Sequence, residues 1–249
     1  MTCESPFPPA LRKRLAGYEP AVPPARFALG VERLDTLLGG GLARARLHEI
    51  WPAEAVDGAS ATGFALMLAQ CASRDGPIVW IAEEKGDQKH GPLYPPGLAE
   101  LGIDPARILF VRAPDEKALL RAAGDVMRSP AAGLAVIAPA GTAPLLDLTA
   151  TRRLTLFAEA SGVTPILLRV ADPQAPSAAA TRWRVAAAPS QALDANAPGL
   201  PAFAIDLLRQ RGGAPSFGWR LEWDRDRARF AALSRNLAAD AGGGYLAAG

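Results

Sequence analysis

The amino-acid sequence predicts an α/β fold: a mostly parallel sheet flanked by helices, followed by a C-terminal antiparallel hairpin. Short apolar runs alternate with segments of helical periodicity between residues 46 and 170, which is typical of parallel strands covered on both faces. Further along, two strand-like runs flank a Gly-Gly-Ala-Pro turn and predict an antiparallel pair. The chain has 249 residues, 49% of them hydrophobic, so it can bury a substantial core and is not a disordered protein.

The first half of the chain contains three predicted strands, of which those at 77–82 and 107–111 are expected to be buried. A short helix at 31–38 ends in three glycines, which accept the left-handed backbone conformation found after helices. A later helix, at 62–73, is apolar on most faces and is expected to be buried. Asp115 follows a proline and is expected to cap a helix through residue 127. The remaining elements expected here are strands at 46–51, 77–82 and 107–111, a loop at 52–61 and a helix at 95–101.

The second half is expected to complete the parallel sheet and then change character. The helix at 145–161 is closed by Gly162, and residues 171–181 are small and proline-containing, as in mobile connections. In the last strand, alternation puts Trp219, Leu221 and Trp223 on one face with Phe217, which favours core packing over base stacking. The strands expected in this half are 133–138, 165–170, 182–187, 204–211 and 218–224.

Counts of cysteine, histidine and charge exclude several classes of protein. The chain has two cysteines, so no disulfide framework is expected, and Cys71 is predicted to be a buried free thiol. His48 and His90 belong to different elements, which argues against a metal site or a His-based triad. The formal net charge of +2 excludes a strongly basic nucleic-acid coat. No apolar run reaches the roughly 20 residues of a membrane span and the N-terminus lacks a signal-peptide pattern, so we expect a cytoplasmic protein without membrane contact.

The run from Gly30 to Leu42, G-V-E-R-L-D-T-L-L-G-G-G-L, is the most specific motif in the chain. It precedes a strand containing Glu49-Ile50, a later strand leads into Glu83-Glu84, and a Leu-Gly-Ile-Asp turn at 101–104 precedes the next strand. The order of these parts resembles the ATP-binding core of RecA over about residues 25 to 190. The resemblance implies a RecA-like core.

The phosphate-binding loop of such a core is degenerate in this chain. That loop needs glycines around the phosphate, a lysine for its charge and Ser or Thr for magnesium. The corresponding residues 52–63 read P-A-E-A-V-D-G-A-S-A-T-G, in which Glu54 and Asp57 repel a triphosphate and no lysine or arginine occurs. The residues that resemble part of a cradle are Gly58, Ser60, Thr62 and Gly63.

The carboxylate that holds magnesium is also missing from its expected place. The third buried strand runs into Ala138-Pro139, where RecA-type cores carry an aspartate. We therefore expect no cofactor, no metal and no ATPase activity, and we assign Glu83 and Glu84 to the solvated surface. The four lysines, at positions 13, 85, 89 and 117, all lie outside the loop.

RecA-like chains without these motifs point to the ImuA family. Segments similar to that family are L-L-G-G-G-L, R-L-H-E-I-W, P-I-V-W-I, L-G-I-D-P-A-R-I-L-F-V and A-T-R-R-L-T-L-F-A-E-A-S-G. The resemblance implies a non-catalytic adaptor in SOS-induced translesion DNA synthesis and mutagenesis. It also implies an ImuB-type pseudo-polymerase and an error-prone C-family polymerase as partners, and it makes RecA a further candidate.

Arginines are the candidate contacts to DNA or to a partner. Adjacent Arg152 and Arg153 diverge by about 100° on a helix, so both a solvated face and a phosphate or protein contact are open. Arg182 and Arg184 share one face of a strand, as either a positive strip or an ordinary polar edge. The C-terminal candidates are Arg225, Arg227 and Arg229. Any DNA contact is expected to be weak at this net charge.

The predicted organisation has four parts. They are a flexible arm at 1–25, a RecA-like core at 26–190, a hairpin extension at 191–235 and a disordered tail at 236–249. A basic helix candidate at 10–17 in the arm is expected to make an intermolecular or domain-docking contact. Two other functions stay open: an active RecA-superfamily ATPase or recombinase with an atypical phosphate loop, and an ATP-independent DNA-binding factor.

Overall fold

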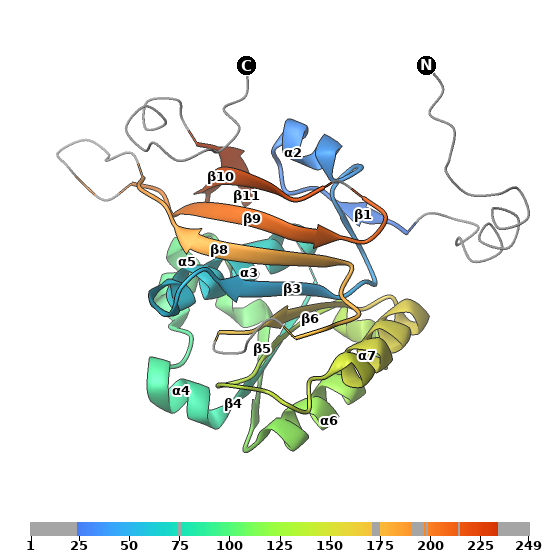
Figure 1. Cartoon of the computed structure of the whole chain (residues 1–249). Coiled ribbons are helices and arrows are strands. Elements are labelled where there is room, and N and C mark those ends of the chain that lie inside the picture. The colour runs from blue at the N-terminus through green and yellow to red at the C-terminus, as the bar shows by residue number, and fades with distance from the viewer. Residues whose placement is uncertain are drawn as a thin grey trace, which may run out of the picture.

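A nine-stranded sheet organises the chain in a computed structural model that describes residues 24–73, 76–170, 175–190, 197, 199–213 and 215–233 (Figure 1). The strand order is β11-β10-β9-β8-β3-β7-β6-β4-β5. Neighbours from β8 through β5 run parallel, whereas β9, β10 and β11 join antiparallel at the other end. This arrangement confirms the predicted mostly parallel sheet with an antiparallel C-terminal hairpin.

The strands have the following bounds. The parallel part contains β3 (His48–Pro52), β4 (Ile78–Glu83), β5 (Ile108–Ala113), β6 (Leu134–Ala138), β7 (Thr164–Leu168) and β8 (Thr181–Ala187). The antiparallel part adds β9 (Ala202–Gln210), β10 (Phe217–Asp224) and β11 (Arg229–Ala232). A separate two-stranded sheet pairs β1 (Arg26–Phe27) with β2 (Leu42–Ala43).

Helices cover both faces of the sheet and thereby create two cores. On β4, Ile78 and Trp80 belong to the core that contains helix α3 (Gly58–Ala72), whereas Val79 and Ile81 belong to the core beneath α6 (Glu116–Val126) and α7 (Leu148–Ser161). Successive side chains of a strand point to opposite faces, so a continuous apolar run is what a doubly covered strand requires. The other helices are α2 (Glu32–Leu37), α4 (Glu84–His90) and α5 (Pro95–Glu100), with short 3-10 turns η1 (Ala55–Asp57), η2 (Pro105–Arg107) and η3 (Pro130–Ala132).

Helix α3 is buried on nearly all sides, as its sequence predicts. Its side chains from Phe64 to Ala72 are buried, and the Phe64 ring lies 5.2 Å from the ring of Phe230 and 5.8 Å from that of Phe203, centroid to centroid. The antiparallel strands β9 and β11 therefore pack against α3 as the parallel strands do. Cys71 is buried within this helix, as predicted, and its Sγ lies 3.8 Å from the Leu29 carbonyl oxygen.

The caps of α6 and α7 follow from individual aspartates. An Asp115 oxygen accepts the Ala118 N–H at 2.7 Å, which confirms the predicted cap. Asp147 accepts the Ala150 N–H at 2.7 Å, so α7 begins three residues later than predicted. The predicted close of α7 at Gly162 is also observed, with a left-handed φ of 84°.

The glycine-rich motif ties the first helix to the chain before it. Both Asp35 carboxylate oxygens accept backbone N–H groups, from Leu29 at 2.8 Å and Gly30 at 3.0 Å. Gly41 has a φ of 99°, and a Cβ there would collide with the Phe27 carbonyl, so no other residue fits. The aspartate and the last glycine of the motif therefore have structural roles at the entrance to the core.

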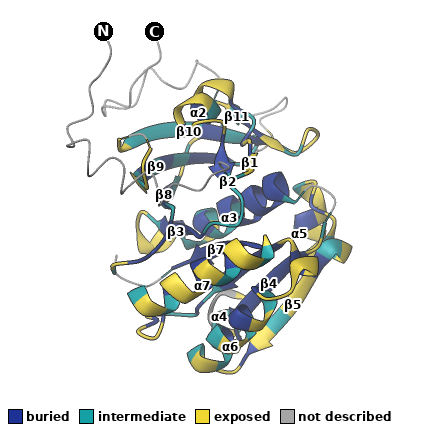
Figure 2. Ribbon diagram, turned by 90° about the vertical axis from the view of Figure 1, so that its right-hand side faces the viewer, coloured by how far each residue is buried: buried dark blue, intermediate teal, exposed yellow. Residues whose placement is uncertain are grey.

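The expectation that residues 107–111 form a buried strand is wrong. This strand, β5, pairs only with β4 and is the edge of the sheet, which leaves Leu109 59% and Phe110 40% exposed (Figure 2). An apolar run indicates a strand but does not say how many neighbours that strand has.

Several other boundaries also differ from the predictions. Helix α3 begins at Gly58 rather than Thr62, because the turn before it is organised by its own carboxylates. The polar helix α4 and the short strands β1, β2 and β11 were not predicted, since none has enough apolar periodicity to show in the sequence.

Some predictions fall outside the described residues. These are the arm before residue 24 with its basic helix candidate, the first four residues of the connection at 171–181, and the tail at 236–249. Within the part of the chain that the structure describes, the helices are too short or too polar to cross a membrane.

Candidate functional site

The turn between β3 and α3 occupies the place of the phosphate-binding loop. The Asp57 carboxylate accepts one backbone donor of the turn and one of the neighbouring strand: one oxygen accepts the Glu54 N–H at 3.1 Å and the other accepts the Ala187 N–H from β8 at 2.9 Å. A phosphate loop works by directing free N–H groups at an anion. Here a resident carboxylate is the anion, and it fastens the turn to the neighbouring strand.

The residues that resemble a cradle are part of helix α3 itself. Gly58 opens the helix against Val170, and the Thr62 hydroxyl donates to the Gly58 carbonyl at 2.9 Å. Ser60 and Gly63 lie further along the same helix, in its first two turns. Their positions are those of helix residues rather than of an open loop.

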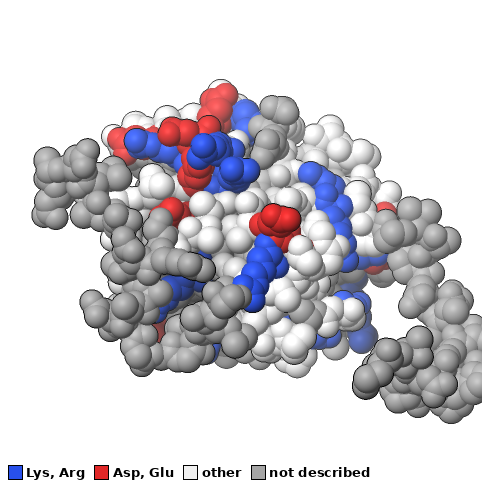
Figure 3. Space-filling view, turned by 90° about the horizontal axis from the view of Figure 1, so that it is seen from above, with Lys and Arg blue, Asp and Glu red and all other residues white. Residues whose placement is uncertain are grey.

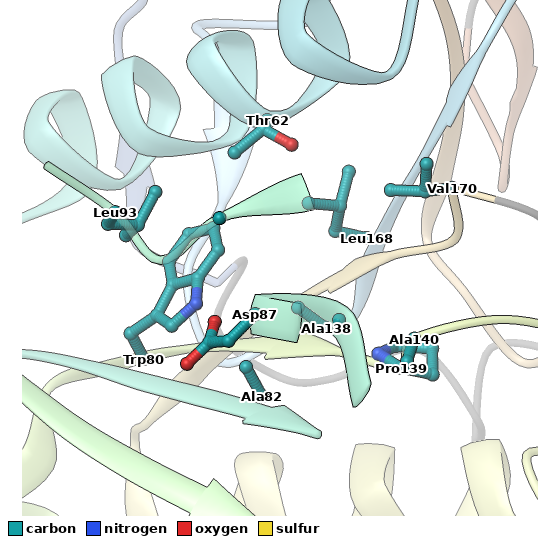
Figure 4. A pocket seen from close by; sticks show the side chains of 12 residues that line it. Thr62, Trp80, Ala82, Asp87, Leu93, Ala138, Pro139, Ala140, Leu168 and Val170 are labelled. Carbon is teal, nitrogen blue, oxygen red and sulfur yellow. The ribbon is translucent and has the colours of Figure 1, made fainter. Parts of the chain in front are cut away.

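A small cavity lies beside this turn, at the carboxyl ends of β4, β6 and β7 (Figure 4). It holds about 90 Å³, and the side chains that line it are mainly apolar, among them Trp80, Ala138, Leu168 and Val170. The one charged residue of the lining is Asp87 of α4, which also accepts a hydrogen bond from Arg112 at 3.0 Å. Ligands of open α/β sheets bind at the carboxyl ends of the strands, but the residues that line this cavity include no cation to hold a phosphate.

Glu83 and Glu84 differ from each other in their surroundings. Glu84 is exposed on α4, as predicted, whereas Glu83 is buried at the end of β4 and accepts the Ala140 N–H at 3.4 Å. The assignment of Glu83 to the solvated surface is therefore wrong. Its carboxylate holds the segment after β6, which forms one wall of the cavity. Among the described residues, no group of three or more His, Cys, Asp or Glu side chains is placed to hold a metal ion.

A buried ionic cluster lies on the α7 face of β3 and was not predicted. Glu49 is fully buried, and its carboxylate accepts the Ser177 hydroxyl at 2.6 Å, Arg182 Nε at 3.2 Å and Arg169 Nε at 3.4 Å. Arg169, 1% exposed, also donates to the Leu146 carbonyl at 2.6 Å. A charged residue inside an apolar run requires a buried partner. Glu49 in R-L-H-E-I-W and Arg169 in P-I-L-L-R-V are therefore the sequence features from which a buried ion pair could have been predicted.

His48 links β3 to β8 and to β2 through hydrogen bonds of its neutral ring. Its Nδ1 lies 2.7 Å from the Thr181 hydroxyl and its Nε2 lies 2.8 Å from the Ala43 carbonyl oxygen. Burial lowers the pKa of His48 to about 4, against the smaller raising effect of the Ala43 hydrogen bond. The ring is neutral at ordinary pH and acts as a structural link.

The predicted pair on β8 is divided between two environments. Arg182 is held by Glu49, and its guanidinium lies 4.5 Å from the centroid of the Trp51 ring. Arg184 reaches the surface and pairs with Asp206 of β9 at 2.8 Å. The two arginines do share one face of the strand, but their charges are matched within the protein.

The C-terminal arginines lie around the turn from β10 to β11. Arg227 pairs with Asp224 at 2.7 Å, an interaction that lowers the pKa of Asp224 through the side-chain hydrogen bond. Arg225 and Arg229 are exposed and have no hydrogen-bond or ion-pair partner among the described residues. Basic and acidic side chains are interleaved at this end of the molecule, as Figure 3 shows from above.

Arg152 and Arg153 are both exposed on α7. Glu159, a carboxylate further along the same helix, pairs with Arg46 at 2.7 Å and not with either of them. Neither arginine has a partner within the described ranges, so the two remain available for an external contact.

Three comparisons with known proteins bear on these features. No protein-family model matches the chain. Two curated relatives, each described as Protein ImuA, come from Caulobacter vibrioides strains NA1000 / CB15N and ATCC 19089 / CIP 103742 / CB 15. Each is 34% identical over 199 residues, which cover 74% of this chain and 77% of the relative.

A solved structure also resembles the fold. The crystal structure of the RadB recombinase matches with a TM-score of 0.56 at 16% identity, over 84% of this chain and 100% of that chain. At such low identity the match bears on the fold alone, and it agrees with the RecA-like arrangement expected from the sequence.

Proposed function

The chain belongs to the ImuA family, and from that premise we propose that it is a non-catalytic RecA-like adaptor in SOS-induced translesion DNA synthesis and mutagenesis. Family membership and the RecA-like fold support an accessory role in DNA-damage-induced mutagenesis. The adaptor acts in the cytoplasm with an ImuB-type pseudo-polymerase and an error-prone C-family polymerase, and RecA is a further candidate partner.

The turn between β3 and α3 is the observation that carries the non-catalytic part of this proposal. The Asp57 carboxylate accepts the Glu54 N–H of the turn and the Ala187 N–H of β8, so a triphosphate would meet a fixed negative charge at this place. The adjoining cavity adds apolar walls and the acid Asp87. The carboxylates of Asp57 and Asp87 both oppose nucleotide binding by electrostatics.

Nucleotide binding by the full-length chain tests the absence of ATP chemistry. We expect no saturable heat of binding with ATP and magnesium, and no phosphate release with or without single-stranded DNA. Micromolar binding with turnover would instead support the active-ATPase alternative.

Partner capture tests the adaptor role. The tagged chain is recovered from cells after DNA damage, beside a version that ends after Leu233. That end point keeps β11, whose Phe230 is fully buried in the core. We expect the full chain to recover the ImuB-type protein and the C-family polymerase, and failure to recover either would contradict the proposal.

Direct DNA binding without ATP is the second candidate, because Arg152, Arg153, Arg225 and Arg229 are exposed and without partners among the described residues. It predicts a DNA affinity that falls steeply as salt concentration rises, because bound counterions are released. Affinity measured on a short duplex over a series of salt concentrations distinguishes it from the adaptor.

A further inference from the structure

The outer surfaces of α6 and α7 carry positively charged side chains that are available for an external contact. Four exposed cations on these helices have no hydrogen-bond or ion-pair partner within the described residues: Lys117, Arg121, Arg152 and Arg153. Exposed arginines and lysines of this kind are free to bind carboxylates from another molecule.

The carboxylates of the same surface are already engaged. Asp115 and Asp147 cap the two helices, and Glu116 accepts the Leu145 N–H at 2.7 Å. Asp125 pairs with Arg128 at 2.8 Å, and Glu159 pairs with Arg46. Each of these carboxylates therefore has a hydrogen-bond or ion-pair partner in the protein, whereas the four cations have none among the described residues, and the three that accept backbone N–H groups keep their negative charge.

Helices α6 and α7 lie side by side, so their exposed cations belong to neighbouring surfaces. The guanidinium of Arg128, which follows the end of α6, lies 5.2 Å from the centroid of the Phe157 ring of α7. Lys117 and Arg121 are four residues apart within α6 and therefore lie on one stripe of that helix. Arg153 precedes Phe157 by one turn on the facing helix.

An apolar side chain stands among these charges. Leu156 is 62% exposed and lies one turn beyond Arg152 and Arg153 on α7. A leucine in that position favours contact with an apolar group of a partner, because that contact removes apolar surface from water. The arginines beside it favour a partner with negative charge and help to fix its orientation.

We propose that this α6–α7 surface, made of Lys117, Arg121, Arg152, Arg153 and Leu156, is a docking surface for an acidic segment of a partner protein that also presents an apolar side chain. The inference rests on the proposed adaptor function and gives it a binding surface. Charge complementarity selects the acidic occupant, and Leu156 requires an apolar group within it.

The chain's own ends do not have the composition of this occupant. Residues 1–23 contain two acidic and three basic residues, and residues 234–249 contain one of each. A nucleic-acid backbone offers phosphates to the arginines but leaves Leu156 without an apolar counterpart. The observations therefore favour a separate, acidic protein.

The test measures the affinity of the full-length chain for the ImuB-type protein encoded by the same genome. The first variant is Arg152→Glu/Arg153→Glu and the second is Leu156→Ser. The matched control is Arg33→Glu/Arg211→Glu, which makes the same charge change at two exposed arginines on other elements that also lack partners among the described residues. Circular dichroism shows that each variant is folded.

We expect the double arginine variant to bind at least about tenfold more weakly and to lose most of the salt dependence of binding. Leu156→Ser is expected to weaken binding about fivefold with the salt dependence unchanged, because it removes apolar contact only. The control is expected to stay within about twofold of the wild-type affinity.

The possible failures are distinguishable. If the wild-type chain binds and both α7 variants bind equally well, the docking surface is wrong while the adaptor proposal stands. Absence of binding by the wild-type chain overturns both. If the arginine variant loses affinity for a short DNA duplex but keeps its affinity for the protein, the surface is a nucleic-acid contact and the inference is overturned.

Discussion

Glu49, Arg169 and Arg182 form an ionic cluster inside the sheet, and its energetics differ from those of a surface pair. Buried charges are expensive to desolvate, and they persist because each carboxylate oxygen and guanidinium finds a partner. Glu49 satisfies three donors at once, from the chain just after β7, from β8 and from the segment between them. The cluster therefore fixes how β7 and β8 sit on either side of β3.

Replacing Glu49 tests this role. Glu49→Gln leaves two arginines facing a neutral amide, and we expect the free energy of unfolding to fall by about 3 kcal/mol or more. Arg184→Gln, which breaks the exposed pair with Asp206 on the same sheet face, is expected to cost less than about 1 kcal/mol. Urea denaturation of both variants measures this difference. Equal losses of unfolding free energy would show that the buried cluster stabilises the fold no more than the exposed pair does.

His48 makes stability depend on pH in a defined window. Its pKa is about 4 in the folded protein, against 6.5 for a histidine in water, so the unfolded chain takes up a proton first as pH falls. The free energy of unfolding should thus decrease from pH 6.5 toward pH 4, by about 3 kcal/mol from this residue. Above the unfolded pKa the contribution is fully present.

The variant His48→Gln removes that titration. Denaturation at a series of pH values is expected to show a shallower loss of stability on acidification than in the wild-type protein, with the carboxylates providing the remainder. An unchanged pH slope would mean that His48 does not titrate as its burial requires.

At the scale of elements, the turn between β3 and α3 shows how a functional loop becomes a structural one. Its two carboxylates, which in the sequence argue only against a phosphate, turn out to organise the turn: Asp57 binds the Glu54 N–H and the backbone of β8. The helix consequently starts at Gly58, without an open loop before Thr62.

Removing this acceptor should destabilise the protein rather than open a nucleotide site. Asp57→Ala leaves two backbone donors without their acceptor, and we expect a loss of about 1–3 kcal/mol in the free energy of unfolding. Asp57→Asn keeps one acceptor oxygen and should lose less. If thermal unfolding shows no change in either variant, the turn is not held by this carboxylate.

The edge strand β5 provides a second test at this scale. Leu109 and Val79 are paired in register on β5 and β4, but Leu109 is largely exposed whereas Val79 is buried. Leu109→Thr is expected to change the free energy of unfolding by about 0.5 kcal/mol or less, whereas Val79→Thr buries a hydroxyl and should cost about 1–3 kcal/mol. Similar effects in chemical denaturation would contradict the assignment of β5 as an edge.

At the scale of the whole molecule, the antiparallel strands and the parallel sheet share one core around α3. Phe64 of α3 contacts Phe203 of β9 and Phe230 of β11, and Phe230 also lies 5.1 Å from Trp223 of β10 between ring centroids. Helix α3 is thus enclosed by both parts of the sheet, and neither part can expose it without a large loss of apolar burial.

A single substitution at this junction should weaken the entire fold. Phe230→Ala is expected to lower the free energy of unfolding by about 3–5 kcal/mol. Far-ultraviolet circular dichroism and tryptophan fluorescence should still report one transition, because Trp80 and Trp223 belong to the same core. Two separated transitions would instead show that the C-terminal strands unfold on their own.

The sequence by itself determined the local structure and the class of fold. Apolar runs of strand length, helical stripes and capping residues act between neighbours in the chain, so the strands β3, β4, β6 and β7 and the cap at Asp115 were predictable. The absence of a lysine and of a strand-end aspartate is equally plain in the printed sequence, as are the motifs shared with the ImuA family.

Only the tertiary structure decided which side chains share an environment. Glu49 and Arg169 are 120 residues apart, and their pairing depends on β7 lying beside β3. Which elements lie next to one another also decides why Leu109 and Leu156 are exposed and Glu83 is buried. The same holds for β11, the last strand in the chain, which forms by pairing with β10. Burial and ion pairing are properties of neighbours in space, and neighbours across this sheet come from distant parts of the chain.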